Sequence, residues 1–218
     1  MHFSLVFCCL LSYVASLPTL SARSKIRALS LDVTGTLIAT KEPVIKSYHD
    51  AAIWARLPNP PTQDEIKKGF KVAFRERCTE SPCYGGVEDI SGREWWRETV
   101  ARVLQHAKPD VKYSEQDFDR YFRRVYQHFG SPAGYVVLAD ARNLLESQST
   151  SEVLLGITSN TPSRHMESVL PMLDIHNHFK WFACSQDVKF EKPSLEIFQA
   201  SYEQARFWIP ELKKSEGE

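Results

Sequence analysis

The sequence predicts an α/β fold, in which a parallel sheet carries a helical module inserted after its first strand. Three short apolar runs, at residues 26–31, 153–157 and 180–184, each end in a polar loop. A helical pattern follows the second and third loops, and strands that alternate with helices are typical of a doubly wound parallel sheet. Between the first and second runs lie about a hundred residues whose apolar positions repeat with the period of a helix.

The polar loops are predicted to meet at one edge of this sheet. The first covers residues 32–36, and the second covers residues 158–160 and precedes a helix at about 162–173. The third runs to Lys192, and a helix begins near Ser194. Because open α/β sheets bind ligands beyond the carboxyl ends of their strands, these loops are the expected site.

The insertion is predicted to form four helices, because apolar side chains recur at spacings of three and four. Their predicted ranges are 43–57, 64–76, 92–107 and 114–129. The turn between the first two helices is marked by Pro58, Pro60 and Pro61. The insertion is therefore a folded module and not a linker.

Some side chains that could carry chemistry have an ordinary structural interpretation. Trp95 and Trp96 are expected to pack between helices of the insertion, and the alternative is that they line a substrate pocket. His165, His176 and His178 lie in or after a predicted helix without a metal-ligand pattern. These histidines are therefore expected at the surface.

The charge balance excludes one broad class of partner. Lys and Arg together number 27, and Asp and Glu also number 27. A chain without net charge has no overall field that attracts nucleic acid or an anionic membrane surface. We therefore expect no nucleic-acid partner, and any anion must be bound locally.

The first 24 residues resemble a targeting segment. Residues 3–15 form an apolar run, and no acidic residue precedes Asp32. Such a segment is typical of a signal peptide, and the Ser and Arg residues that follow are typical of an organelle transit peptide. A membrane anchor and a wrongly assigned start are the alternatives, although about 13 apolar residues are few for a span. The sequence thus favours the secretory pathway or an organelle without choosing between them, and no membrane span is expected in the mature chain.

Three cysteines follow this segment: Cys78, Cys83 and Cys184. Cys78 and Cys83 could pair in an oxidising compartment, and free thiols are the other interpretation. The odd number, without CxxC or paired histidines, argues against a metal site.

The three polar loops resemble, in order, the first three motifs of the haloacid dehalogenase-like (HAD) hydrolase superfamily. They read Asp32-Val33-Thr34-Gly35-Thr36, Thr158-Ser159-Asn160 and Lys192-Pro193-Ser194. Cap-like segments of the insertion, Lys68-Gly69-Phe70, Tyr84-Gly85 and Glu94-Trp95-Trp96, strengthen the resemblance. It implies a Rossmann-like HAD core at residues 25–40 and 136–218 and an α-helical cap at residues 41–135.

The resemblance also implies a catalytic apparatus. Asp32 is expected to attack phosphorus and form an aspartyl-phosphate that water hydrolyses, so that one difficult displacement becomes two. Ser159, with help from Thr158 and Asn160, is expected to bind a phosphoryl oxygen, while Lys192 neutralises charge. Backbone N–H groups near Val33 and Thr34 would complete the phosphate site. Mg²⁺ would be held by the Asp32 carboxylate and the Thr34 carbonyl, since Mg²⁺ prefers oxygen ligands.

Two departures from the family pattern bear on activity. Thr34 stands where phosphatases of the superfamily carry an acidic residue that protonates the leaving group; loss of such help costs about 10²- to 10⁴-fold in rate. The fourth motif, a Gly-Asp pair that supplies further Mg²⁺ ligands, is not found before Glu218. The implied core is thus truncated at its C-terminal end; a gene model, a splice form and a genuine loss all fit.

The truncation leads to an expectation about association. The polar tail at residues 209–218 cannot replace a buried strand, so the first strand should become a sheet edge. Exposed edges invite pairing with another chain, and self-association is therefore expected.

The expected function is a Mg²⁺-dependent phosphohydrolase of a small phosphorylated metabolite. Hydrolysis of a carbon–halogen bond, which uses an Asp nucleophile without a metal, is a second possibility. A non-catalytic binding or regulatory protein is the third, because of Thr34 and the missing fourth motif.

Overall fold

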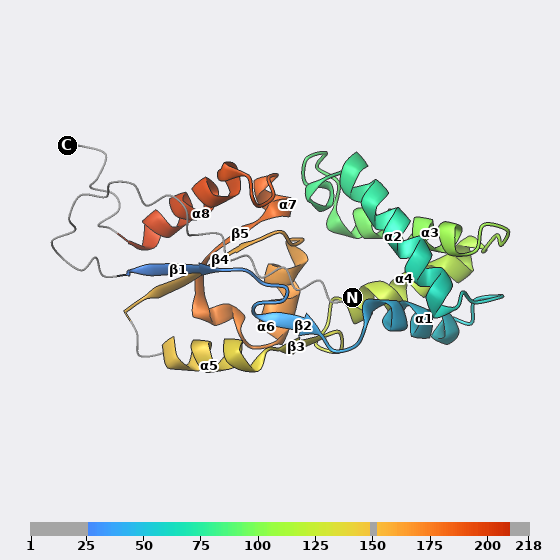
Figure 1. Cartoon of the computed structure of the whole chain (residues 1–218), viewed down its shortest axis with the longest axis horizontal. Coiled ribbons are helices and arrows are strands. Elements are labelled where there is room, and N and C mark those ends of the chain that lie inside the picture. Colours follow the sequence, from blue (N-terminus) through green and yellow to red (C-terminus); the bar gives the residue numbers. More distant parts are fainter. Residues whose placement is uncertain (1–25, 149–151, 210–218) are drawn as a thin grey trace, which may run out of the picture.

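The structure, a computed structural model, describes residues 26–148 and 152–209. The predicted targeting segment and nearly all of the polar tail lie outside these residues. Figure 1 shows two parts, a small sheet with helices on both faces and a module of four helices at one end of it. The α/β architecture with an inserted helical module is as the sequence predicts. No helix of the described part of the chain is both long enough and apolar enough to cross a membrane.

The sheet places the three predicted loops at one edge. Strands β1 (Ala28–Leu31), β4 (Leu154–Ser159) and β5 (Phe179–Cys184) pair in parallel in the order β1-β4-β5. Their carboxyl ends all point toward the helical module (Figure 1). Parallel pairing therefore brings the loops that follow β1 and β4 side by side, under the cap.

Strand β1 is an edge of this sheet among the described strands, because its only ladder is with β4. Leu29 on this strand is 39% exposed. An exposed edge agrees with the expectation from the sequence. Self-association through it stays a prediction.

Helices cover both faces of the sheet, as Figure 1 shows. Helix α8 (Leu195–Trp208) packs on β4 and β5, and α5 (Ala139–Gln148) lies on the opposite side. The helix expected at residues 162–173 is instead a π-helical segment, η2 (His165–Val169), followed by the short α6 (Leu170–Met172). Pro171 lies in α6 and cannot donate a backbone hydrogen bond, which disfavours a regular α-helix through this segment.

Several elements were not predicted from the sequence. Strands β2 (Ile38–Thr40) and β3 (Tyr135–Val137) form an antiparallel ribbon near the junctions between core and cap. Helix α7 (Ser185–Val188) follows β5 directly. Helix α5 was also missed. Strands of three residues and a helix of four are too short to show a periodicity.

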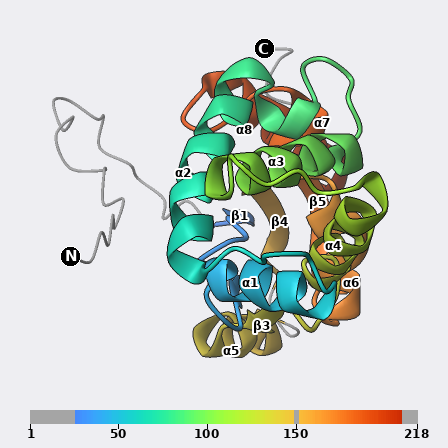
Figure 2. The same ribbon diagram turned by 90° about the vertical axis from the view of Figure 1, so that its right-hand side faces the viewer.

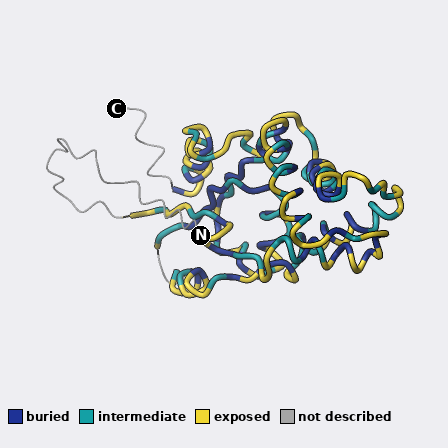
Figure 3. The backbone as a smooth tube through the Cα atoms, turned by 45° about the vertical axis from the view of Figure 1, so that its right-hand side comes forward, coloured by how far each residue is buried: buried dark blue, intermediate teal, exposed yellow. Residues whose placement is uncertain are grey.

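The helical module contains α1 (Val44–Trp54), α2 (Gln63–Glu80), α3 (Gly92–Ala107) and α4 (Glu115–His128). It has its own buried apolar cluster, separate from the one around the sheet. Figure 3 shows buried residues within both parts, and Figure 2 shows the module from the side that faces away from the core. We call it the cap.

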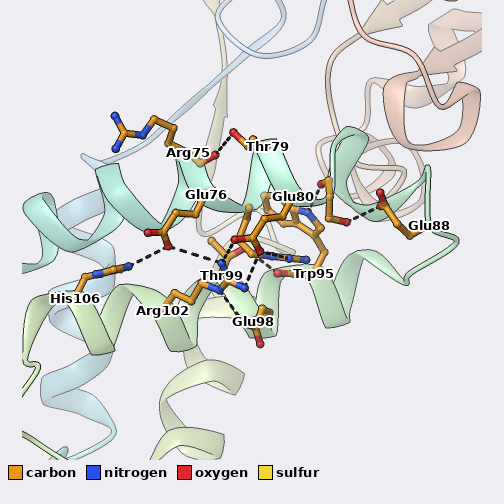
Figure 4. A network of polar contacts seen from close by, with 12 residues as sticks. Arg75, Glu76, Thr79, Glu80, Glu88, Trp95, Glu98, Thr99, Arg102 and His106 are labelled. Atoms are coloured by element: carbon orange, nitrogen blue, oxygen red, sulfur yellow. Dashed lines mark hydrogen bonds and ion pairs between the residues drawn. The ribbon is translucent and has the colours of Figure 1, made fainter.

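Helices α2 and α3 pack closely because of Gly69. A Cβ atom there would lie 2.6 Å from the backbone oxygen of Val103, which no side chain tolerates. A surface network also joins the two helices: Arg102 contacts Glu80 and Glu98, and His106 contacts Glu76 (Figure 4). The close approach explains the glycine of the Lys68-Gly69-Phe70 segment.

We expect the Thr62→Ala substitution to destabilise the protein by about 1 kcal/mol. The Thr62 hydroxyl accepts a hydrogen bond from the Glu65 N–H, and the Glu65 carboxylate accepts one from the Thr62 N–H, so one substitution removes half of a capping box. Urea unfolding would measure the change. Thr79→Ala, near the other end of α2, is the matched control and should stay within about 0.5 kcal/mol; equal effects would contradict the capping role.

Candidate active site

Three predicted residues meet beyond the carboxyl ends of β1 and β4. The Ser159 hydroxyl donates a hydrogen bond of 2.6 Å to Oδ1 of Asp32, and Lys192 Nζ lies 3.0 Å from the same oxygen. Asp32 follows β1 and Ser159 ends β4, and Leu31 pairs with Ile157 in the ladder. Sheet register therefore sets the Asp32–Ser159 contact, while the loop after α7 supplies Lys192.

Both contacts are made to the same oxygen of the Asp32 carboxylate. Oδ2 is consequently engaged by neither Ser159 nor Lys192. The Asp32 side chain remains 39% exposed, so a ligand can reach it. A carboxylate held by one oxygen and open at the other is suited to nucleophilic attack, and the lysine beside it is suited to binding an anion.

Asn160 holds the Lys192 segment in place. Its Nδ2 donates to the backbone oxygen of Lys192 at 3.0 Å, and its Oδ1 accepts from the backbone N–H of Lys192 at 2.7 Å. The peptide bond that follows, Lys192-Pro193, is cis. Asn160 was predicted to contact substrate; here both ends of its amide are used to position the lysine.

Thr158 does not join the cluster, which contradicts its predicted role as a substrate contact. Its buried hydroxyl lies 2.5 Å from the Ser30 hydroxyl and donates to the Ser201 hydroxyl at 2.7 Å, on the side of α8. Successive side chains of a strand point to opposite faces. Since Ser159 points to Asp32, Thr158 must point away.

The loop after Asp32 folds back on itself. The Val33 carbonyl accepts hydrogen bonds from the N–H groups of Leu37 and Ile38, and Gly35 adopts a φ of 82°, which favours glycine. The Val33 side chain is fully buried in the core, whereas Thr34 is exposed. Phosphate binding by the backbone N–H groups near Val33 and Thr34 stays a prediction.

The oxygen ligands for Mg²⁺ form only part of a full set. The two predicted ligands are the Asp32 carboxylate and the Thr34 carbonyl. No cluster of three or more His, Cys, Asp or Glu side chains suited to a metal occurs within residues 26–148 and 152–209. Mg²⁺ in phosphoryl-transfer sites is commonly bound through one or two carboxylates, waters and substrate phosphate. The Asp32 carboxylate and the Thr34 carbonyl fit a Mg²⁺ ion whose remaining ligands are waters and substrate phosphate.

A cavity of about 290 Å³ lies between cap and core, with Thr34 in its wall. Its lining is mainly aromatic and comes from all four cap helices as well as the core. The aromatic residues are Tyr48, Phe70, Phe74, Tyr84, Trp96, Phe122, Tyr126, Phe129 and Tyr135. The cavity therefore offers a mainly apolar binding space, with a residue of the Asp32 loop in its wall.

The two adjacent tryptophans, Trp95 and Trp96, have different environments. Trp96 lines the cavity, whereas Trp95 is fully buried between helices and donates from Nε1 to the Ser81 carbonyl at 2.7 Å. His165 also lines the cavity, in contrast to the predicted surface position. Burial lowers the pKa of His165 to about 4, so its imidazole is neutral near pH 7. His176 and His178 are partly exposed.

The loop between α2 and α3 closes the cavity against the core, which the sequence did not predict. The Tyr84 hydroxyl donates to the Asn160 carbonyl at 3.2 Å, and Gln186 Nε2 donates to the Tyr84 carbonyl at 3.3 Å. A Cβ on Gly86 would lie 2.1 Å from the Gln186 carbonyl, so the two backbones are in direct contact. Burial is the main cause that raises the pKa of Tyr84.

The three cysteines of the described chain are free thiols. Cys83 and Cys184 are buried, and Cys78 is exposed. The Cys78–Cys83 disulfide that the sequence left open is therefore not formed.

Comparison with known proteins identifies relatives of this arrangement. The family model described as haloacid dehalogenase-like hydrolase matches residues 26–206. Haloacid dehalogenase-like hydrolase domain-containing protein 3 of Mus musculus is 29% identical over 185 residues, which cover 84% of this chain and 70% of the mouse protein.

Solved structures share the fold at lower identity. L-2-haloacid dehalogenase of Xanthobacter autotrophicus is 16% identical with a TM-score of 0.55, and the match covers 82% of this chain and 64% of the dehalogenase. A Bacillus subtilis protein described as an HAD-hydrolase, bound to magnesium, is 18% identical with a TM-score of 0.52 and coverages of 83% and 72%. At these identities the likeness shows the fold alone.

Proposed function

Because the chain belongs to the haloacid dehalogenase-like hydrolase family, we propose that it is a Mg²⁺-dependent phosphohydrolase that acts on a small phosphorylated metabolite through an aspartyl-phosphate. The observation that carries the proposal is the convergence of Ser159 and Lys192 on one oxygen of Asp32, which leaves the other oxygen open. The lysine and the hydroxyl are positioned donors of the kind that a phosphoryl group needs.

In the first step Oδ2 of Asp32 attacks phosphorus. A bond forms between Oδ2 and phosphorus, the ester bond breaks, and the leaving oxygen departs with the bonding electrons. Ser159 donates a hydrogen bond to a phosphoryl oxygen, and Lys192 neutralises the added charge. Mg²⁺, when bound by Asp32 and the Thr34 carbonyl, supplies further charge neutralisation at the phosphoryl oxygens.

In the second step water attacks phosphorus. The bond between Asp32 and phosphorus breaks, the carboxylate is restored, and inorganic phosphate leaves. One proton of the water stays on the inorganic phosphate, and the other passes through solvent to the departed oxygen. Asn160 keeps Lys192 beside the reacting group in both steps through its two hydrogen bonds to the Lys192 backbone.

Thr34 restricts the substrates. A threonine hydroxyl is a poor proton donor, so the leaving oxygen departs without acid help, and substrates with stable leaving groups are favoured. Aryl phosphates and acyl phosphates meet this requirement.

We expect the Lys192→Met substitution to lower kcat/KM for phenyl phosphate by about 10²- to 10³-fold, the usual effect of removing one positioned donor. Release of inorganic phosphate in the presence of Mg²⁺ would measure it. Lys112→Met, at an exposed position outside the cluster, is the matched control and should leave the rate unchanged. Equal rates for both variants would overturn the role of Lys192.

A second measurement separates this proposal from the two alternatives. Beryllium fluoride with Mg²⁺ mimics a phosphoryl group on a carboxylate and should raise the melting temperature by mass action. A non-catalytic protein with a defective site should show neither stabilisation nor phosphate release. Chloride release from 2-chloropropionate without metal would instead favour carbon–halogen hydrolysis.

A further inference from the structure

Resting on the proposed phosphohydrolase activity, we propose that the leaving group is a small aromatic compound with a second negative charge, which Arg164 binds in the cavity between cap and core. The substrate is then an aryl phosphate that carries an anion such as a carboxylate. Its phosphoryl group faces Asp32 and its ring occupies the aromatic cavity.

The size and lining of the cavity fit one substituted ring. A closed apolar cavity of about 150 Å³ accepts benzene, and this cavity is about 290 Å³. Phe, Tyr and Trp side chains make up most of its lining, and aromatic rings gain from offset-stacked and edge-to-face contacts. Sugar phosphates, by contrast, carry a hydroxyl group on most of their carbons, which suits a mainly aromatic lining poorly.

The cavity lies next to the nucleophile. Thr34, in its wall, is two residues after Asp32. Tyr84, also in its wall, donates a hydrogen bond to the carbonyl of Asn160, which follows Ser159 in the chain. In the proposed binding mode, the ring lies in the cavity and its ester oxygen extends past Thr34 to the Asp32 carboxylate.

Arg164 supplies the positive charge in this wall. Its guanidinium lies 3.6 Å from the centre of the Tyr126 ring. The guanidinium also packs over Gly130, where a Cβ atom would lie 1.6 Å from Nη2. The group is thus held in one place by an aromatic face and by a residue without a side chain.

This guanidinium lacks an acidic partner. No Asp or Glu lines the cavity, and Arg164 forms no salt bridge with the residues that the structure describes. Burial lowers the pKa of Arg164, with no carboxylate opposing the shift, although the group stays charged at neutral pH. A half-buried cation without a counterion is costly, and an anionic ligand would remove that cost.

Thr161 gives a second, independent indication of a polar ligand group. It is 3% exposed, lines the cavity, and its hydroxyl has no hydrogen-bond partner within the described chain. Buried hydroxyl groups are nearly always paired. A polar substituent on a bound ring would pair it.

The chemistry of the nucleophile site agrees with an aromatic leaving group. Phenols have a pKa of about 10, as the tyrosine side chain shows. A phenolate therefore leaves without the acid that Thr34 cannot provide, whereas an alkoxide would require it.

Binding of two phenols, the products expected from a charged and a neutral aryl phosphate, tests the role of Arg164 without catalysis. We expect calorimetry to show that 4-hydroxybenzoate binds the full chain about 10- to 100-fold more tightly than neutral 4-hydroxybenzamide, the usual effect of a charged hydrogen bond. Arg164→Met should remove this difference, and Arg164→Lys should keep part of it. Arg123→Met, at an exposed position on α4, should leave it unchanged. Circular dichroism would verify that each variant is folded.

Turnover distinguishes the two proposals. If both are right, 4-carboxyphenyl phosphate is hydrolysed with a higher kcat/KM than phenyl phosphate, and Arg164→Met removes the preference. If acetyl phosphate is hydrolysed but neither product binds, or both bind equally, the aromatic-anion inference is wrong and the phosphohydrolase stands. If 4-hydroxybenzoate binds through Arg164 but no phosphate ester is cleaved, the cavity assignment stands and the phosphohydrolase is wrong.

Discussion

Replacing Asp32 by Asn is expected to lower phosphate release from phenyl phosphate by about 10⁴- to 10⁶-fold, as removal of a covalent nucleophile does elsewhere. The amide keeps the shape of the side chain and can still accept the Ser159 hydrogen bond at 2.6 Å. It cannot attack phosphorus as a carboxylate does, and it leaves Lys192 without its counterion. The measurement is inorganic phosphate released in the presence of Mg²⁺.

Two controls accompany this variant. Asp110→Asn changes an exposed aspartate in a loop of the cap and should retain the full rate. Thermal unfolding should show that the Asp32→Asn protein remains folded. If that folded protein kept more than about 1% of the rate, another group would have to be the nucleophile.

The arrangement of the candidate active site follows from the sequence to a large extent. Asp32 directly follows one apolar strand, and Ser159 is the last residue of another. Parallel pairing places the carboxyl ends of neighbouring strands at the same edge of the sheet. The Lys192 loop follows the next strand, β5, for the same reason. Strand order thus predicted that the three loops meet, and the resemblance to the HAD motifs singled out these three residues within them.

The roles of Thr158 and Asn160 required the three-dimensional structure. Strand alternation says that Thr158 and Ser159 point to opposite faces, but it does not say which face holds the site. The two hydrogen bonds from Asn160 to the Lys192 backbone join residues 32 positions apart through a loop of irregular conformation. No periodic pattern encodes such a contact.

The cavity could not be predicted from the sequence either, because its wall consists of segments that are far apart in the chain. The helical period places both Trp95 and Trp96 near the cap interior, yet one is buried among helices and the other faces the cavity. Arg164 directly precedes η2 as its N-cap residue, within a segment that the sequence predicted to be an ordinary α-helix. That its guanidinium lacks an acidic partner can be recognised only from the positions of the neighbouring elements in the structure.

Replacing Trp95 by Ala is expected to lower the free energy of unfolding by about 3–5 kcal/mol, the usual cost of removing a fully buried aromatic side chain. The indole ring is 0% exposed and contacts the rings of Phe74, Tyr84 and Trp96. Its loss would also leave the Ser81 carbonyl without the indole N–H that it accepts at 2.7 Å. A domain is stable by only about 5–15 kcal/mol, so this variant should be close to unfolding at physiological temperature.

Trp54→Ala is the matched control, because it removes the same side chain from the cap surface. Trp54 is 60% exposed, and its main partner is the Arg124 guanidinium, 5.0 Å from the ring centre. An exposed cation–π contact contributes about 0.5–1 kcal/mol, so the control should lose no more than that. Urea unfolding followed by circular dichroism would compare the two variants. Similar losses of unfolding free energy at both positions would contradict the packing described for α3, since Trp95 is buried in the cap and Trp54 is exposed.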